Sequence, residues 1–380
     1  MGATRFIAAH YLIDRGEVIP RPIVKVDADG TILSVEQWER LDSMANTEFY
    51  GGAICAGMVN AHSHVELSYL RGAIPSGTGF AGFARAIGQV RGNFSAEQRQ
   101  RAMEAADQKM WQEGVAAVAD IVNDSSTVDM KRRSAIHYHS MVEVFGLNSS
   151  IEPSQQIARE FGDADLTTHS TYSIQDGVFR QIADECRGPL SIHFMESDDE
   201  AALYRGEGSL AAWYERMGWR CDFLHYGSPA QRVISSVAPY KRIMLVHNCC
   251  VSEQEVQQLE QHFDEGPSWV LCPRSNDYIS ALRPPVEMLR RAGARICIGT
   301  DSLASNSSLS MIDELKCFSD VPAREVLKWA TINGAEALGL RQQLGSIEKG
   351  KRPGVVLIDK VVKRGDELYI ADDAVARRLV

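Results

Sequence analysis

The sequence lacks features that would place it in several large classes of protein. No apolar run approaches the roughly 20 residues that a membrane-spanning helix needs. The N-terminus shows no apolar stretch followed by a small-residue cleavage site. Long basic runs with interleaved aromatic residues are also missing. The 50 acidic residues outnumber the 40 basic residues and give a formal net charge of -10. We therefore expect a soluble, cytoplasmic protein that binds neither membranes nor nucleic acid.

Cysteine pairs with CxxC spacing are absent as well, although the chain contains eight cysteines. A chain of 380 residues with 44% hydrophobic residues can build its own core, so it does not need the disulfides of small secreted domains. We expect reduced and mostly buried thiols.

From about residue 51 onward the sequence contains strand-length apolar runs that alternate with helical stretches. The predicted strands are 114–120, Met141–Phe145, Asp165–Thr168, Leu190–Phe194, Ile243–His247, Trp269–Cys272 and Arg295–Thr300. Such alternation indicates parallel βαβ units in an α/β protein. With the strand that carries His62 and His64, the count fits a (β/α)8, TIM-like barrel, whose catalytic residues lie at the carboxyl ends of the strands.

The two chain ends predict a second, smaller unit. Residues 1–50 contain short alternating runs broken by turns, which are typical of a small antiparallel sheet. A further short strand at Gly354–Ile358 could rejoin that sheet. We therefore expect a small β-sandwich domain formed by residues 1–50 and 345–380, and a barrel formed by residues 51–344.

The strongest chemical pattern is the pair His62 and His64. Side chains alternate along a strand, so both imidazoles point to one face and can hold one metal ion. A second pair, His137 and His139, has the same spacing but precedes the strand Met141–Phe145. It lies at the wrong end of a barrel strand, and we expect it to be structural or on the surface. The spacing alone does not identify a metal site.

Three more predicted strands end in groups that can ligate a metal. One ends near His193, with Glu196 three residues later, another ends at His247, and a third runs into Asp301. Each residue has an ordinary alternative, since a strand-terminal histidine can be a satisfied core residue and a strand-terminal aspartate can be a helix N-cap. The order of HxH, His, His and Asp at strand ends is much more specific than any one of them.

Over essentially its full length the chain resembles the amidohydrolase superfamily. The segments that carry this resemblance are Gly57–His64, His193, His247, Gly299–Asp301 and Leu344–Lys351. Three further elements resemble the deaminase and chlorohydrolase branch: Cys272–Asn276, Thr168–Ser170, and the pairing of His193 with Glu196. The segments most similar to aminodeoxyfutalosine deaminases, which belong to an alternative menaquinone route, are His64–Ser68, His193–Ser197 and Thr300–Asn306.

The resemblance implies a metal-dependent hydrolytic deaminase of an aminated purine nucleoside or related heterocycle. It implies 6-amino-6-deoxyfutalosine as the substrate and ammonia as a product, with Glu66 as the discriminating residue. Several alternatives stay open: a hydrolytic dechlorinase, a deaminase of adenosine, guanine or S-adenosylhomocysteine, a cyclic amide hydrolase, and a non-catalytic barrel scaffold. A scaffold would be expected to lose metal ligands, whereas this chain retains the full set.

The resemblance also implies one divalent metal ion, bound by His62, His64, His193 and Asp301. Two-metal members of the superfamily bridge their ions with a modified lysine on the fourth strand. The only lysine between Ile121 and Ile192 is Lys131, which lies in a charged stretch, so we expect a single ion. Three histidines and a carboxylate suit Zn²⁺ or Fe²⁺, and zinc is the expected metal.

Roles for other side chains follow from the same resemblance. We expect Glu196 to protonate a ring nitrogen or, alternatively, to orient His193. We expect His247 to carry a proton to the leaving amine or to act as a fourth histidine ligand, and Asp301 to serve as both ligand and base. The residues expected to contact the small-molecule substrate are Glu66, Arg71, His169, Glu196 and Asn276. A homodimer is common among similar enzymes, but no interface can be read from the chain.

Overall fold

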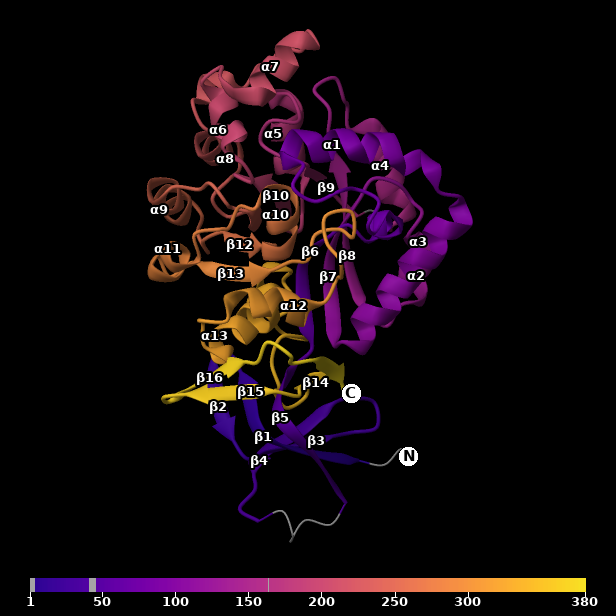
Figure 1. Ribbon diagram of the computed structural model, residues 1–380, viewed down its shortest axis with the longest axis vertical. Helices are drawn as coiled ribbons and strands as arrows, with labels where there is room; N and C mark the ends of the chain where they lie inside the picture. The colour runs from indigo at the N-terminus through magenta and orange to yellow at the C-terminus, as the bar shows by residue number, and fades with distance from the viewer. Residues whose placement is uncertain (1–3, 41–45, 163) are drawn as a thin grey trace.

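The computed structural model describes residues 4–40, 46–162 and 164–380. A larger part, with parallel strands surrounded by helices, lies above a smaller sheet to which both ends of the chain contribute (Figure 1). Among the described residues, no helix combines the length and the apolar character needed to cross a membrane. Of the eight cysteines, four are buried and four are partly buried, and all are free thiols.

Eight parallel strands form the centre of the larger part. They are β6 (Met58–Ser63), β7 (Val115–Val122), β8 (His137–Val144), β9 (Asp165–Thr168), β10 (Leu190–Phe194), β11 (Ile243–His247), β12 (Ser268–Leu271) and β13 (Arg295–Ile298). They pair as two four-stranded sheets, β6-β7-β8-β9 and β10-β11-β12-β13. Isolated parallel bridges join Ser63 to Asp301 at one seam and Ser170 to His193 at the other. The fold is therefore the predicted (β/α)8, TIM-like architecture with an additional small sheet.

Most barrel strands lie where the sequence predicts them, and β8 shows the largest difference. The sequence predicts that β8 begins at Met141, but it begins at His137, which pairs with Ala117 of β7. Pairing with a neighbouring strand extends β8 through polar residues that carry no apolar signal. His137 and His139 consequently lie at the amino end of β8. Catalytic groups are expected at the opposite, carboxyl end of a barrel strand.

Helices connect the strands and cover the barrel. They are η2 (Val65–Leu70), α1 (Gly79–Val90), η3 (Arg91–Asn93), α2 (Ala96–Gln112), α3 (Val128–Arg133), α4 (Glu152–Glu160), α5 (Asp176–Glu185), α6 (Asp198–Tyr204), α7 (Gly208–Arg216), η4 (Leu224–Tyr226), α8 (Pro229–Ser236), α9 (Glu253–His262), α10 (Pro273–Ser280), α11 (Val286–Arg291), α12 (Met311–Leu315), η5 (Lys316–Phe318), α13 (Ala323–Lys328), η6 (Trp329–Asn333) and α14 (Gly334–Ala337). α2 shows the physical basis: a capping box at Ser95 starts it, and Met103, Ala106 and Met110 form its buried face. Figure 1 shows α6 and α7 at the end of the molecule opposite the small sheet.

The smaller part is a seven-stranded sheet with a neighbouring hairpin. Its strands are β1 (Arg5–Asp14), β2 (Glu17–Pro20), β3 (Pro22–Val26), β4 (Ile32–Gln37), β5 (Thr47–Ala56), β14 (Val355–Ile358) and β17 (Ala376–Arg378), and the hairpin is β15 (Val361–Arg364) and β16 (Glu367–Ile370). The predicted late strand is β14, which pairs with β5. The sheet is not wholly antiparallel as predicted, because β5 returns to the far side of β1 and pairs with it in parallel.

Candidate active site

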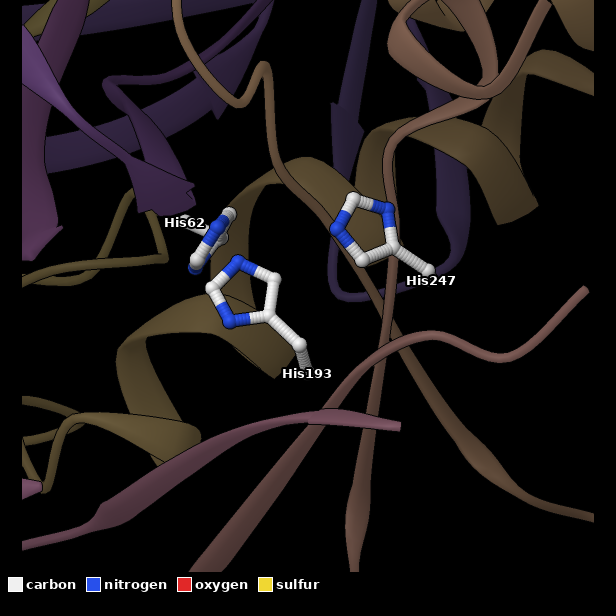
Figure 2. A group of neighbouring side chains, drawn as sticks. All are labelled: His62, His193 and His247. Carbon is white, nitrogen blue, oxygen red and sulfur yellow. The ribbon is translucent and has the colours of Figure 1, made fainter. Parts of the chain in front are cut away.

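Four histidines and one aspartate converge at the carboxyl ends of the barrel strands. His62 lies near the end of β6 and His64 just beyond it, while His193 and His247 lie at the ends of β10 and β11. Asp301 follows β13, and each of the five residues is at most 7% exposed. In Figure 2 the rings of His62, His193 and His247 come from separate segments and turn toward one another. The barrel therefore gathers residues that are far apart in the sequence into one buried cluster.

The distances in this cluster are short enough for shared binding of one ion. The ring centroids of His62 and His64 are 5.0 Å apart, and those of His62 and His193 are 4.8 Å apart. The Nε2 atoms of His62 and His64 lie 3.9 Å and 3.7 Å from Oδ1 of Asp301. Two groups of candidate ligands, His62–His64–Asp301 and His62–His193–His247, each have their ligand atoms within 4.8 Å of one another. Because both groups include His62, this residue is the centre of the cluster.

Unpaired ring nitrogens indicate that the cluster suits a metal ion. Both ring nitrogens of His62 and the Nδ1 atom of His64 are buried without a hydrogen-bond partner in the protein, which is costly unless another group satisfies them. Burial, reinforced by the neighbouring histidines, lowers the pKa of His62 well below its usual value. The ring is therefore held in the neutral form that binds metals.

The protein also fixes the orientation of two candidate ligands. The Nδ1 atom of His193 lies 2.8 Å from the carbonyl oxygen of His169, which directs the other ring nitrogen into the cluster. Hydroxyl groups of Ser275 and Ser305 donate to Oδ2 of Asp301 at 2.5 Å and 2.8 Å. Oδ1 of Asp301 is thereby left for the histidines. Sequence reasoning did not assign either serine a role, although it singled out the segments that contain them, Cys272–Asn276 and Thr300–Asn306.

Left-handed backbone conformations occur at three of the strand ends. The φ angle is 49° at Met195, 79° at His247 and 55° at Asp301. Leu245 of β11 shares a core cluster with Val256 of α9, so regular alternation would direct His247 toward the helices as well. The positive φ at His247 interrupts the alternation and turns its ring into the barrel. Such strained conformations are concentrated at functional sites, because the surrounding structure must hold them.

Glu196 and His247 lie close to each other beside the cluster. Oε1 of Glu196 lies 3.8 Å from Nε2 of His247. Burial is the main cause that raises the pKa of Glu196, so this carboxyl keeps its proton to a higher pH than an exposed one. Nδ2 of Asn276 lies 3.0 Å from Nδ1 of His247. The structure therefore places Asn276 against the histidine ring, where its amide holds that ring. The expected contact of Asn276 with the substrate stays a prediction.

His169 follows β9 and faces a carboxylate that sequence reasoning missed. Its Nδ1 atom lies 2.7 Å from Oε1 of Glu143 on β8. Burial would raise the pKa of Glu143, but the charge of His169 and its hydrogen bond lower that pKa to about 2. Burial also lowers the pKa of His169, but Glu143 outweighs this effect and raises it. An acidic residue inside the apolar run Met141–Phe145 was the available sequence signal.

Glu66 and Arg71 lie on the segment that follows His64. The carboxylate of Glu66 accepts hydrogen bonds from the backbone and side-chain nitrogens of Asn123, at 2.9 Å and 3.1 Å. Burial raises the pKa of Glu66 to about 8. Arg71 is exposed at the end of η2 and, with Leu303, lines a cleft of about 450 Å³. In the structure, therefore, Glu66 is bonded to protein groups and Arg71 lines an exposed cleft.

Lys131 pairs with a buried aspartate, Asp120. Its ammonium group lies 2.5 Å from Oδ2 of Asp120 and donates to the hydroxyl of Ser140 at 2.8 Å. It also lies over the ring of Phe161. The one lysine that sequence reasoning considered for bridging two metals therefore has other partners.

Comparisons with known proteins agree with this architecture. The amidohydrolase family model matches residues 53–376. An adenosine deaminase from Helicobacter pylori is 28% identical over 331 residues, which cover 80% of this chain and 78% of the relative. The structure of H. pylori aminofutalosine deaminase in complex with methylthio-coformycin has a TM-score of 0.79 at 24% identity, covering 99% of this chain and 100% of that one. A zinc-bound adenosine deaminase from Xanthomonas campestris has a TM-score of 0.73 at 23% identity, covering 93% and 84%. These structural similarities show the common fold.

Proposed function

This chain belongs to the amidohydrolase family, and on that premise we propose that it is a metal-dependent hydrolytic deaminase of an adenosine-like substrate. The observation that carries the proposal is the buried cluster of His62, His64, His193 and Asp301 beside Glu196, whose pKa is raised by burial. The names of two similar proteins, an adenosine deaminase and an aminofutalosine deaminase, support the reaction class.

We assign one divalent metal ion to the site, with His62, His64, His193 and Asp301 as its ligands. Zinc is the expected ion, since the adenosine deaminase from X. campestris contains it. When bound, such an ion lowers the pKa of a water molecule so that it becomes a nucleophile near neutral pH. The protein groups that hold Asp301 and His193 orient these ligands in advance.

The remaining side chains supply the proton transfers of a hydrolytic deamination. Glu196, in its protonated form, donates to the ring nitrogen next to the aminated carbon and makes that carbon more electrophilic. His247 lies 3.8 Å from Glu196 and carries a proton toward the leaving amine. His169, held by Glu143 through its Nδ1 atom, presents its other ring nitrogen to the substrate. The products are ammonia and the heterocycle with an oxygen in place of the amine.

Among adenosine-like compounds we propose 6-amino-6-deoxyfutalosine as the substrate, which would place the protein in menaquinone biosynthesis in the cytoplasm. The sequence segments His64–Ser68 and His193–Ser197 support this choice, and so does the similarity in fold to an aminofutalosine deaminase. Adenosine is the second candidate, because the H. pylori relative with 28% identity bears that name.

The test is ammonia release by the zinc-loaded protein from 6-amino-6-deoxyfutalosine, adenosine, methylthioadenosine, S-adenosylhomocysteine and guanine, with chloride release followed for a chlorotriazine. We expect rapid release from the first compound and much slower release from the others. Turnover of a different aminated purine would retain the deaminase and reject the preferred substrate. Chloride release would assign dechlorination instead. No turnover of any compound, by protein with stoichiometric metal, would reject the proposed reaction.

A further inference from the structure

An exposed phenylalanine lies at the mouth of the barrel, and the proposed proton transfers do not use it. Phe145 directly follows β8 and is 53% exposed. We propose that Phe145 is a specificity-determining residue that packs against an apolar or planar substituent carried by the heterocycle. This inference rests on the proposed function. A single exposed apolar residue is common on protein surfaces, so the case depends on where Phe145 points and what lies beside it.

The alternation of β8 directs Phe145 toward the barrel axis. Glu143 points into the barrel, where it contacts His169. Val142 points outward and packs with Ala158 of α4. Side chains two residues apart lie on the same face of a strand, so Phe145 continues the inward-facing side of β8, one step beyond its last residue. Its ring consequently stands above Glu143, over the opening of the barrel.

Three rings lead from the candidate metal ligands to this opening. The ring centroid of His169 lies 4.5 Å from that of His193 and 6.3 Å from that of Phe145. Hydrolysis takes place at the His193 end of this series, because the candidate ligands lie there. Phe145 can therefore contact only a part of the substrate that lies farther out than the reacting carbon. In a nucleoside that part is the substituent on the heterocycle.

Backbone hydrogen bonds fix the segment that carries the ring. The carbonyl oxygen of Phe145 accepts a bond from the hydroxyl of Ser149 at 2.5 Å, and the backbone nitrogen of Gly146 donates to the carbonyl oxygen of Ser173 at 2.8 Å. The backbone nitrogen of His169 donates to the carbonyl oxygen of Val144 at 3.1 Å. This bond connects the segments that carry Phe145 and His169. Because the segment of Phe145 is already ordered before a substrate binds, binding costs little conformational entropy there.

The chemistry of the contact sets the selectivity. A phenyl ring gains from covering an apolar or aromatic group, whereas a hydroxyl group in the same place would lose hydration without a hydrogen-bond partner. Phe145 should therefore favour substrates with an apolar or planar group on the substituent over those that end in a hydroxyl. The preference belongs to substrate binding, so it should change KM and leave kcat at saturation nearly constant.

The experiment compares the variants Phe145→Ala and Phe145→Trp on 6-amino-6-deoxyfutalosine, methylthioadenosine and adenosine. For Phe145→Ala we expect KM for the first two to rise about tenfold, with a much smaller change for adenosine and with unchanged kcat and zinc content. Phe145→Trp should retain the wild-type KM values. Tyr240→Ala is the matched control, because Tyr240 is 73% exposed but lies before β11, at the amino end of the barrel.

The outcomes separate this inference from the function on which it rests. If the wild type is active and Phe145→Ala changes KM equally for all three nucleosides, or for none, the role of Phe145 is overturned and the deaminase stands. A fall in kcat without a change in KM would also overturn it. If the zinc-loaded wild type releases ammonia from none of the three, and from neither S-adenosylhomocysteine nor guanine, the proposed function fails, and the role of Phe145 fails with it.

Discussion

The two oxygens of Asp301 have different partners, and this difference makes its surroundings testable residue by residue. Oδ1 faces the imidazoles of His62 and His64, whereas Oδ2 accepts bonds from the hydroxyls of Ser275 and Ser305. A carboxylate held on one side keeps its other oxygen in a fixed direction. The serines should therefore influence the metal without touching it.

Ser275→Ala removes one of these two bonds, and we expect the affinity for zinc to fall about 10- to 100-fold. The measurement is a competition titration with a chromogenic chelator. Ser319→Ala is the control, because Ser319 is an exposed serine that follows η5 and should not influence the metal. Equal zinc affinities in wild type and Ser275→Ala would show that Asp301 does not need this support.

Glu196→Gln should separate proton donation from ligand orientation. An amide cannot supply the acidic proton, so we expect kcat for ammonia release to fall about 10²- to 10⁴-fold with zinc content unchanged. Glu253→Gln, at an exposed position in α9, should behave as wild type. A parallel loss of zinc in Glu196→Gln would instead mean that this carboxyl acts by orienting His193.

At the residue scale, the sequence predicts the roles of histidine and aspartate at strand ends better than the roles of serine in loops. His193, His247 and Asp301 stand out because ligand types end successive apolar runs, and the structure brings them together. Ser275 and Ser305 carry no such signal, since serine is common in loops and its role depends on what lies opposite. Glu143 lies between these cases, because a charged residue inside a buried strand needs a partner.

At the scale of elements, the close approach of β13 to β6 positions the cluster. Gly299 follows β13, and a Cβ atom there would lie 2.8 Å from Cβ of His62 and 3.0 Å from Sγ of Cys272. Real Cβ atoms do not tolerate the first of these contacts, so the two strand ends would have to separate. The absence of a side chain at Gly299 therefore lets His62 and Asp301 face each other.

Gly299→Ala should destabilise the protein by about 1–3 kcal/mol and weaken zinc binding, because any movement shifts β6 relative to β13. Urea unfolding and zinc titration measure the two effects. Gly177→Ala gives the opposite control: Gly177 lies in α5 with nothing within 4 Å of the added atom, and alanine there should stabilise by about 0.5–1 kcal/mol. Wild-type stability and zinc affinity in Gly299→Ala would show that the close approach is dispensable.

The elements themselves are largely predictable, because buried parallel strands are continuous apolar runs with polar ends. Three of them, Asp165–Thr168, Leu190–Phe194 and Ile243–His247, have the predicted limits. The start of β8 differs because His137 to Ser140 are polar, and only pairing with β7 makes them a strand. The inward turn of His247 was equally hidden, since a positive φ at a non-glycine residue leaves no pattern in the sequence.

At the scale of the whole molecule, buried carboxyls link stability to pH. Burial is the main cause that raises the pKa values of Glu66, Glu200 and Glu314 from 4.5 to about 8. Between these limits the folded chain holds more protons on these groups than the unfolded chain does. Their contribution is therefore complete below pH 4.5, and it is lost as the pH rises toward 8.

Glu314→Gln removes one of these contributions, so its free energy of unfolding should fall less steeply with rising pH than that of the wild type. The difference in slope is at most about 1.4 kcal/mol per pH unit. Urea unfolding of metal-free protein at several pH values from 5 to 8.5 measures it, and terms shared by both proteins cancel in the comparison. The exposed Glu265→Gln should keep the wild-type slope. Identical slopes for all three proteins would contradict the prediction.

The arrangement of the small sheet was only partly predictable. The short strands and the return of Gly354–Ile358 follow from local alternation and turn residues. The parallel pairing of β1 with β5 does not, because the choice of neighbour in a sheet depends on contacts between distant segments. Both outcomes have the same cause, since the periodicity of a sequence predicts a strand but not the strand with which it pairs.

The pairing of β5 with β14 also sets an order of events during synthesis. Val355 pairs with Ala56, so one edge of β5 has no partner until the ribosome has made the entire barrel. A nascent chain carries this open edge throughout translation, and open strand edges invite pairing with other chains. The sheet that contains the first strands to be synthesised is thus the last to obtain all its strand pairs. Slow translation of the final segment would prolong the period in which the chain is prone to aggregate.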